Sequence, residues 1–294
     1  MLEKLKANIV FHAVLKRKDI RKAYKMVGPE DSWYDTISTV HKSLAEIRTL
    51  PHEDWEVISH DGLTLKGIFY PGTSDKTMIW VHGYSSHAER ESAFPGLFYH
   101  SLGFNVLVPY LRAHGPSEGK FITFGALESM DICKWVELVN QRHPDGSILL
   151  HGLSMGGGVV LDLSTKTMPN VKCMIADAPT VSIPGAFGSI VGGTFKADQD
   201  KILNCLKDRF WRQFSVDMDN YHWLEKIAHG KYPLLLSAGS NEGMDETLAK
   251  LKERNPMPTE LVILPGCNHG NGMYKQTKLY QNAIKGFVQA YMGN

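Results

Sequence analysis

The sequence predicts an α/β protein whose mostly parallel central sheet is covered by helices on both faces. Three observations support this fold class. Short apolar runs bounded by turn residues recur from Trp55 onward. Most of these runs are separated by amphipathic stretches long enough for a crossover helix, such as Phe124–Arg142. The first two runs instead flank Asp61-Gly62, a strong hairpin signal, so we expect the sheet to open with an antiparallel pair.

The expected strands follow one another along the chain. The hairpin is DWEVISHDGLTLKGIFY, residues 54–70. Six further apolar runs, each four to seven residues long, lie in TMIWVHG (77–83), NVLVPY (105–110), SILLHG (147–152), KCMIADAP (172–179), YPLLLSAG (232–239) and ELVILPG (260–266). In open parallel sheets function gathers at the carboxyl ends of the strands, so functional residues are expected in the loops that follow these runs.

The alternation is interrupted between Thr180 and Lys231, where about fifty residues separate two consecutive strands. A crossover needs far fewer residues, and the stretch 198–214 has a helical pattern. We expect a helical lid insertion over the active face, at about residues 180–231. The alternative is a helical subdomain that only adds stability.

The first fifty residues also depart from the alternation, and we expect residues 1–52 to form a helical extension before a main domain of residues 53–294. Apolar residues recur at spacings of three and four in a basic background, at Leu2, Leu5, Ile9, Ala13, Ile20, Ala23 and Val27. We expect this amphipathic helix to pack on the body with a solvated basic face. Docking on a membrane surface or a partner is the alternative. A second helix is expected within residues 29–51, ended by Pro51.

Composition limits the classes of protein that need be considered. With 294 residues, 43% of them hydrophobic, the chain can bury a sizeable core. Its 32 basic and 31 acidic residues nearly cancel, so charge favours neither nucleic acid nor an anionic membrane as a partner. The N-terminal stretch has no uninterrupted apolar region and no small-residue cleavage site, and we expect a cytoplasmic protein without membrane association. The four cysteines lack the paired spacing of a zinc site; we expect no metal and no organic cofactor.

The stretch SILLHGLSMGGGVVLDL, residues 147–163, carries the main chemical signal. It has the pattern of a buried strand followed by a buried helix, which places Ser154 on the corner between them. A turn that sharp strains its central residue and brings the neighbouring chain so close that only glycine fits on either side. Gly152 and Gly156 meet that need. The alternative is an ordinary strand end followed by a serine cap.

With this serine corner inside the strand and helix alternation, the chain resembles the α/β hydrolase superfamily, in its branch of serine esterases and peptidases with a helical lid. The resemblance extends from Trp55 to the C-terminus and implies the α/β hydrolase fold with Ser154 as nucleophile. A hydroxyl is a poor nucleophile at neutral pH, so it needs a histidine as base and an acid that orients that histidine. In this superfamily the chain order is serine, acid, histidine. His269 follows the last expected strand and is the predicted base.

The acid is where the chain departs from the family pattern. Relatives usually place an aspartate three residues after the glycine that ends the preceding strand, whereas LLLSAGSNEGMDE has Glu242 at that spacing from Gly239. Glu242 is the predicted acid. Asp245 in the same loop is the first alternative, and Asp177 in ADAPT, after an earlier strand, is the second.

Acyl transfer also needs donors for the developing oxyanion. The N–H of Met155, next to the nucleophile, is one expected donor. The resemblance implies that the second is the N–H of Tyr84, which follows His82-Gly83. His82 is expected to be structural. LRAHGPSEGK, residues 111–120, resembles a loop of the same superfamily in which Arg112 braces neighbouring loops.

These residues predict a serine hydrolase that cleaves small-molecule carboxylic esters through an acyl-enzyme. An aminopeptidase-like amide or peptide hydrolase is the alternative, because several aminopeptidases share these motifs. A non-catalytic binding protein with a degenerate triad is the alternative of another class. The aromatic residues of the insertion are expected to form an apolar wall above Ser154 that favours short to medium uncharged acyl groups; they are Phe187, Phe195, Phe210, Trp211, Phe214, Tyr221 and Trp223.

Overall fold

The fold was obtained as a computed structural model that describes residues 2–18, 30–195 and 198–293. Eight strands form one sheet in the order β1-β2-β4-β3-β5-β6-β7-β8. Their bounds are β1 (Glu53–Ile58), β2 (Thr64–Tyr70), β3 (Lys76–Val81), β4 (Asn105–Pro109), β5 (Ser147–Leu153), β6 (Val171–Asp177), β7 (Leu234–Gly239) and β8 (Thr259–Leu264). Every apolar run named above forms one of these strands, so the predicted fold class is confirmed.

The directions of the strands determine which loops meet at one edge of the sheet. β1 pairs antiparallel with β2, and β2 pairs antiparallel with β4. All other neighbouring strands are parallel, so β3 to β8 end at the same edge. Ser154 follows β5 there, Glu242 lies just after β7, and His269 lies in the loop after β8. The parallel part of the sheet thus gathers the predicted triad at its carboxyl edge.

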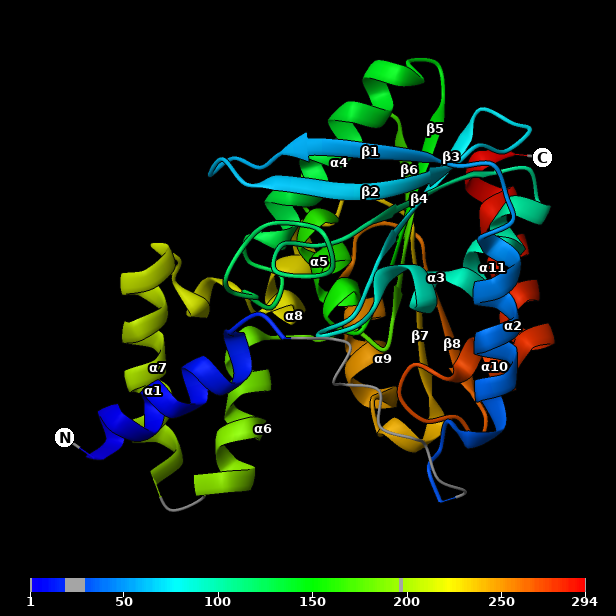
Figure 1. Cartoon of the computed structure of the whole chain (residues 1–294). Coiled ribbons are helices and arrows are strands. Elements are labelled where there is room, and N and C mark those ends of the chain that lie inside the picture. Colours follow the sequence, from blue (N-terminus) through cyan, green and yellow to red (C-terminus); the bar gives the residue numbers. More distant parts are fainter. Residues whose placement is uncertain (1, 19–29, 196–197, 294) are drawn as a thin grey trace.

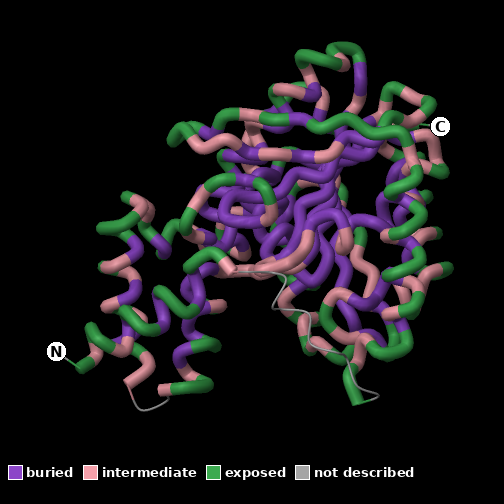
Figure 2. The backbone as a smooth tube through the Cα atoms, viewed as in Figure 1, coloured by how far each residue is buried: buried purple, intermediate pink, exposed green. Residues whose placement is uncertain are grey.

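Helices cover both faces of the sheet, as Figure 1 shows. One face carries α2 (Ile37–Ile47), α3 (Ala88–Ser101) and α11 (Thr277–Met292); the other carries α4 (Glu128–Arg142), α5 (Met155–Leu163), α8 (Trp223–Lys226) and α9 (Asp245–Arg254). Successive strand residues alternate between the two cores, as a period of two requires. In β3, Met78 belongs to the core under α3, and Ile79 to the core under α4. The buried backbone in Figure 2 is concentrated in the sheet and the helix faces that meet it.

The insertion is helical, as predicted, and it packs beside the N-terminal helix. α6 (Ile183–Phe195) and α7 (Gln199–Phe214) form a group with α1 (Leu2–Leu15) to one side of the sheet (Figure 1). Two short 3-10 helices, η4 (Met218–Asn220) and η5 (Ile227–His229), flank α8. Phe11 of α1 stacks on Phe214 of α7 with ring centroids 5.9 Å apart. The predicted boundary between residues 52 and 53 stays a prediction.

The prediction of which face of α1 packs on the body is wrong. Leu2, Leu5 and Ile9 are each more than half exposed. The buried residues of α1 are Ala7, Val10, Phe11, Val14 and Leu15. Spacing at three and four fits both sets, because α1 carries apolar residues on opposite faces; the aromatic contacts of Phe11 decide which face is covered. The predicted positions Ile20, Ala23 and Val27 lie outside the described residues. Among the helices that the structure describes, none has the length and hydropathy needed to cross a membrane.

Candidate active site

Ser154 lies on a strained corner between β5 and α5. Its φ is 59°, in the left-handed region, which costs a non-glycine residue about 1–3 kcal/mol. A Cβ atom at Gly152 would overlap the backbone of Gly156, and one at Gly156 would overlap the carbonyl of Val81 at the end of β3. The Ser154 N–H donates to the carbonyl of Asp177 at 2.8 Å, which ties the corner to β6. Both glycines are therefore required by close backbone approach.

His269 bridges Ser154 and Glu242. Its Nε2 lies 2.8 Å from Ser154 Oγ, and its Nδ1 lies 2.6 Å from Glu242 Oε2. With the proton on Nδ1, the ring donates to the carboxylate and accepts the serine hydroxyl proton at Nε2. The hydrogen bond to Glu242 raises the pKa of His269, and burial opposes that rise. This is the arrangement that general-base activation of a serine needs.

Glu242 is held in place by its second oxygen. It ends the single-turn η6 (Ser240–Glu242), where Oε1 accepts a hydrogen bond from the Gly239 N–H at 2.7 Å. Its side chain is 8% exposed, against 58% for His269. One carboxylate oxygen therefore binds backbone and the other binds the imidazole, which leaves the group little freedom to rotate.

The two alternative acids lie elsewhere. Asp245 is exposed at the first position of α9. Asp177 is buried at the end of β6, where it accepts a hydrogen bond from Ser237 Oγ at 2.9 Å; burial raises its pKa to about 6. Of the three candidate acids, Glu242 is the one in hydrogen-bond contact with His269.

The loop after β3 places Tyr84 beside Ser154 in the same pocket. The Tyr84 phenol donates to the carbonyl of Val14 at 2.6 Å, and its ring stacks on Phe124 at a centroid distance of 4.8 Å. The side chain is thus anchored away from the reacting atoms. No acceptor for the Tyr84 N–H or the Met155 N–H is found among the described residues. Both main-chain donors remain candidates for the oxyanion hole.

Glu91 of α3, which the sequence did not single out, stands behind this loop and lines the pocket. The Gly83 N–H donates to its two oxygens at 3.0 and 3.2 Å, and the Trp80 indole N–H donates to it at 3.1 Å. Burial raises the pKa of Glu91 to about 7. The carboxyl group fixes the residue that precedes Tyr84. In sequence, Glu91 is one of several charged residues of a helix, and only the fold brings it to Gly83.

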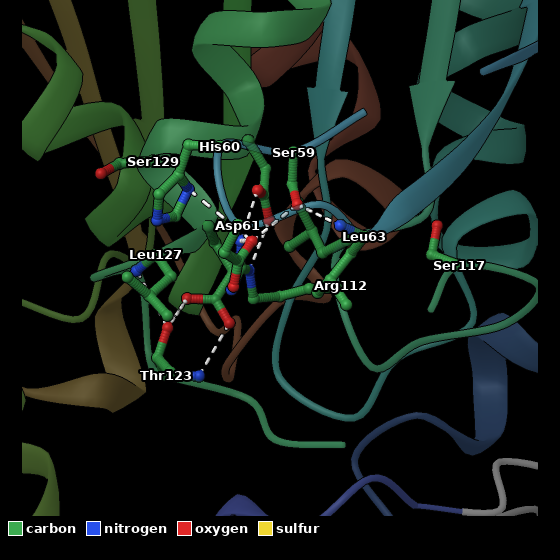
Figure 3. A network of polar contacts seen from close by, with 12 residues as sticks. Ser59, His60, Asp61, Leu63, Arg112, Ser117, Thr123, Leu127 and Ser129 are labelled. Carbon is green, nitrogen blue, oxygen red and sulfur yellow. Dashed lines mark hydrogen bonds and ion pairs between the residues drawn. The ribbon is translucent and has the colours of Figure 1, made fainter. Parts of the chain in front are cut away.

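Arg112 braces the loops behind the site, as expected for the LRAHGPSEGK stretch. Its guanidinium contacts Asp61 at 3.0 Å (Figure 3). It also contacts the buried Asp131 at 2.6 Å. Burial acts to raise the pKa of Asp61, but hydrogen bonds from Arg112 and Ser59 lower it to about 2. Among the described residues, His60, Asp61 and Asp131 are close enough to hold a metal ion, yet the Arg112 cation already lies between the two carboxylates. The cluster is a structural ion-pair network.

A cavity of about 480 Å³ opens at Ser154. It is lined by the loop after β3, by α3, by the loop that carries His269, and by Trp33 and Val40 of the N-terminal segment. Of the insertion at 180–231, no described residue lines it. The expected aromatic wall above Ser154 is therefore wrong.

The aromatic residues of the insertion have other apolar partners. Phe214 packs against Phe11 of α1 and against Phe121 in the loop before α4. Phe187 contacts Phe124 of the same loop at 5.2 Å. Trp211 is instead 56% exposed. Phe214 and Phe187 are thus packed against α1 and that loop, and Trp223 packs against α5 at Gly158.

Comparison with known families agrees with this geometry. A sequence profile of the family described as serine aminopeptidase, S33, matches residues 72–242, more than half of the chain. The chain belongs to this family. The predicted membership of the α/β hydrolase superfamily is thereby confirmed. The match includes Tyr84, Ser154 and Glu242, whereas His269 and the N-terminal segment lie outside it.

Curated relatives match parts of this S33 chain. The multifunctional-autoprocessing repeats-in-toxin of Vibrio vulnificus is 30% identical over 186 residues, which are 62% of this chain and 3% of the toxin. The uncharacterized protein YqkD of Bacillus subtilis is 35% identical over 102 residues, 34% of this chain and 33% of that protein. The chain thus spans a third or less of the length of these two relatives.

Solved structures match nearly the whole S33 chain. The esterase Pf2001 of Pyrococcus furiosus has a TM-score of 0.68 at 25% identity, covering 92% of this chain and 99% of that one. Est1E of Butyrivibrio proteoclasticus, solved with ferulic acid bound, has a TM-score of 0.65 at 18% identity, covering 82% of this chain and 100% of its own. An acetyl xylan esterase from Paenibacillus sp. R4 has a TM-score of 0.60 at 15% identity, with coverages of 92% and 98%. The last two show the shared fold alone.

Proposed function

We propose that this S33-family protein is a serine esterase that cleaves small, uncharged carboxylic esters. The observation that carries the proposal is the continuous hydrogen-bonded series from Ser154 through His269 to Glu242, at 2.8 and 2.6 Å. The similarity to the esterase Pf2001 over 92% of the chain supports the ester class. A cavity of about 480 Å³ suits a small-molecule substrate.

In the proposed acylation step, Ser154 Oγ attacks the ester carbonyl carbon as His269 Nε2 takes the hydroxyl proton. The carbonyl π electrons move to oxygen, and the Tyr84 and Met155 N–H groups stabilise the resulting oxyanion. Collapse of the tetrahedral intermediate breaks the bond to the alcohol, which leaves with the proton from His269. Glu242 holds the Nδ1 proton and stabilises the imidazolium throughout.

Deacylation repeats these steps with water. His269 takes a proton from the water molecule, the hydroxide attacks the acyl carbon, and Ser154 Oγ leaves with the proton that the histidine returns. The carboxylic acid is released and the starting state is restored. Together with the water molecule, the side chains and main-chain donors named here supply every proton and charge in the cycle, so the proposed mechanism calls for no cofactor.

An aminopeptidase-like amide hydrolase is the second candidate, and the family description favours it. Ser154, His269 and Glu242 could cleave amides by the same steps, but the leaving amine must be protonated before it departs. Hydrolysis of aminoacyl p-nitroanilides relative to p-nitrophenyl esters separates the two substrate classes. A binding protein with a broken triad is disfavoured by the intact contacts of His269 on both sides.

The test of the proposal is ester hydrolysis by the wild-type chain and by Ser154→Ala. We expect p-nitrophenyl butyrate turnover to fall about 10⁴-fold in the variant, because the reacting atom is lost. A fluorophosphonate probe should label the wild type and leave the variant unlabelled. An unlabelled wild type, or a variant that keeps turnover near the wild-type rate, would refute the assignment.

A further inference from the structure

The N-terminal segment before α2 is attached to the loop that carries His269. The Asn271 side-chain amide donates to the carbonyl of Ser32 at 3.0 Å, and Asn271 is fully buried. The Trp33 ring meets the Tyr274 ring edge-on at 5.6 Å. A Cβ atom at Gly270 would come within 3.2 Å of the Trp33 ring. The indole therefore packs directly against the residue that follows His269.

The same segment is also held against α3. Arg48, just after α2, forms two hydrogen bonds to Glu89 of α3, one of them at 2.9 Å through Nε. Val40 and Ile47 of α2 are buried. Trp33 itself is followed by the single-turn η2 (Tyr34–Thr36), where Thr36 Oγ donates to the Trp33 carbonyl at 2.7 Å. The segment from Trp33 to α2 is thus held at two places, by the loop that carries His269 and by α3.

This fixed segment forms one side of the cavity at Ser154. The apolar residues that line this cavity include Trp33, Val40, Pro95, Leu153, Met273 and Tyr274. Trp33 and Val40 belong to the N-terminal segment, and Pro95 belongs to the helix on which that segment packs. The insertion at 180–231, the expected specificity element, contributes none of the described lining residues. The wall that limits the substrate on this side therefore comes from residues 33–40.

We propose that Trp33 is a specificity-determining residue, which limits the length of the apolar substrate group that the cavity accepts. The inference rests on the proposed esterase function and adds its substrate class: esters whose acyl or alcohol chain is short enough to end at the indole. Replacing the ring by a methyl group opens the cavity beside Tyr274 and changes no atom of Ser154, His269 or Glu242.

The experiment compares chain-length profiles of the wild type, Trp33→Ala and Trp33→Phe. Two substrate series are used, p-nitrophenyl esters from acetate to octanoate and alkyl acetates from ethyl to octyl. Each additional methylene group of the substrate that fits in the cavity increases kcat/KM several-fold. We expect the ratio of long-chain to short-chain kcat/KM to rise about tenfold or more in Trp33→Ala in one of the two series, with Trp33→Phe between it and the wild type.

Trp211→Ala is the matched control, because it removes the same side chain from an exposed position on α7. We expect its ratios to stay within about twofold of wild type. Fluorophosphonate titration of Ser154 gives the fraction of active sites in each variant, so loss of folding cannot imitate a change in ratio. If Trp33→Ala does not fold, Trp33→Phe decides the question by the same ratios.

Unchanged ratios in both series, for a variant with wild-type labelling, would overturn the role of Trp33. That outcome differs from failure of the esterase proposal, in which the wild type itself neither labels nor turns over ester. A ratio that rises equally in Trp211→Ala would also overturn it, because the effect would then not come from the cavity.

Discussion

Glu242→Gln tests the acid of the proposed triad with the smallest possible change in shape. In the wild type, Oε1 accepts from the Gly239 N–H at 2.7 Å and Oε2 accepts from His269 Nδ1 at 2.6 Å. The glutamine amide has one oxygen and one NH₂ group. The Gly239 N–H needs an acceptor, so the amide oxygen stays there and the NH₂ group faces the imidazole.

The NH₂ group forces His269 into the wrong tautomer. Nδ1 must then accept, the ring proton moves to Nε2, and Nε2 cannot take the proton of Ser154. We expect kcat/KM to fall about 10⁴-fold, which at about 1.36 kcal/mol per tenfold corresponds to about 5.4 kcal/mol of transition-state stabilisation. Glu242→Asp should be milder, because it keeps the acceptor but shortens its reach by one methylene.

The assay is p-nitrophenyl butyrate hydrolysis at the pH of maximal activity, with thermal unfolding to show that the variant is folded. Asp245→Asn makes the same chemical change three residues further on, at an exposed position, and should stay within about twofold of wild type. A Glu242→Gln enzyme within tenfold of wild type would refute the argument. A large loss in Asp245→Asn or Asp177→Asn would then identify the acid instead.

Because Glu242 raises the pKa of His269 and the base must be neutral, kcat/KM should fall as the pH drops through a pKa above that of a free histidine; a pH–rate profile whose acid limb lies below that value would contradict this. His269→Ala should be about as severe as Ser154→Ala, and the double variant little worse, because the residues act as one unit; additive losses in kcat/KM would assign His269 to substrate binding. Gly156→Ala should destabilise the fold by about 3 kcal/mol or more, since its Cβ overlaps the Val81 carbonyl, and lower the Tm by about 6 °C or more in a calorimetric scan; an unchanged Tm would show that the corner relaxes freely.

Local sequence patterns were sufficient to predict the strands of the sheet and the sharp turn at Ser154. Each strand is an apolar run with turn residues at its ends, and Gly152 is required by the close approach of Gly156 within one β-strand, turn and helix unit. Such features depend on residues close in the chain, so their spacing alone predicts them. The spacing of Glu242 from Gly239 is also a local feature of the chain, and the structure has this carboxylate 2.6 Å from His269 Nδ1.

Tertiary structure decided everything that depends on which surfaces meet. The apolar spacing in α1 fits two opposite faces, and only packing of Phe11 on α7 selects one. Glu91 and Trp33 carry no local signal, yet the fold brings the first to Gly83 and the second to Gly270. Seven aromatic residues of the insertion were expected to form a wall above Ser154, but Phe187 and Phe214 pack against the loop before α4 and against α1. Apolar burial is non-directional, so composition shows that a side chain will be covered but not by which element.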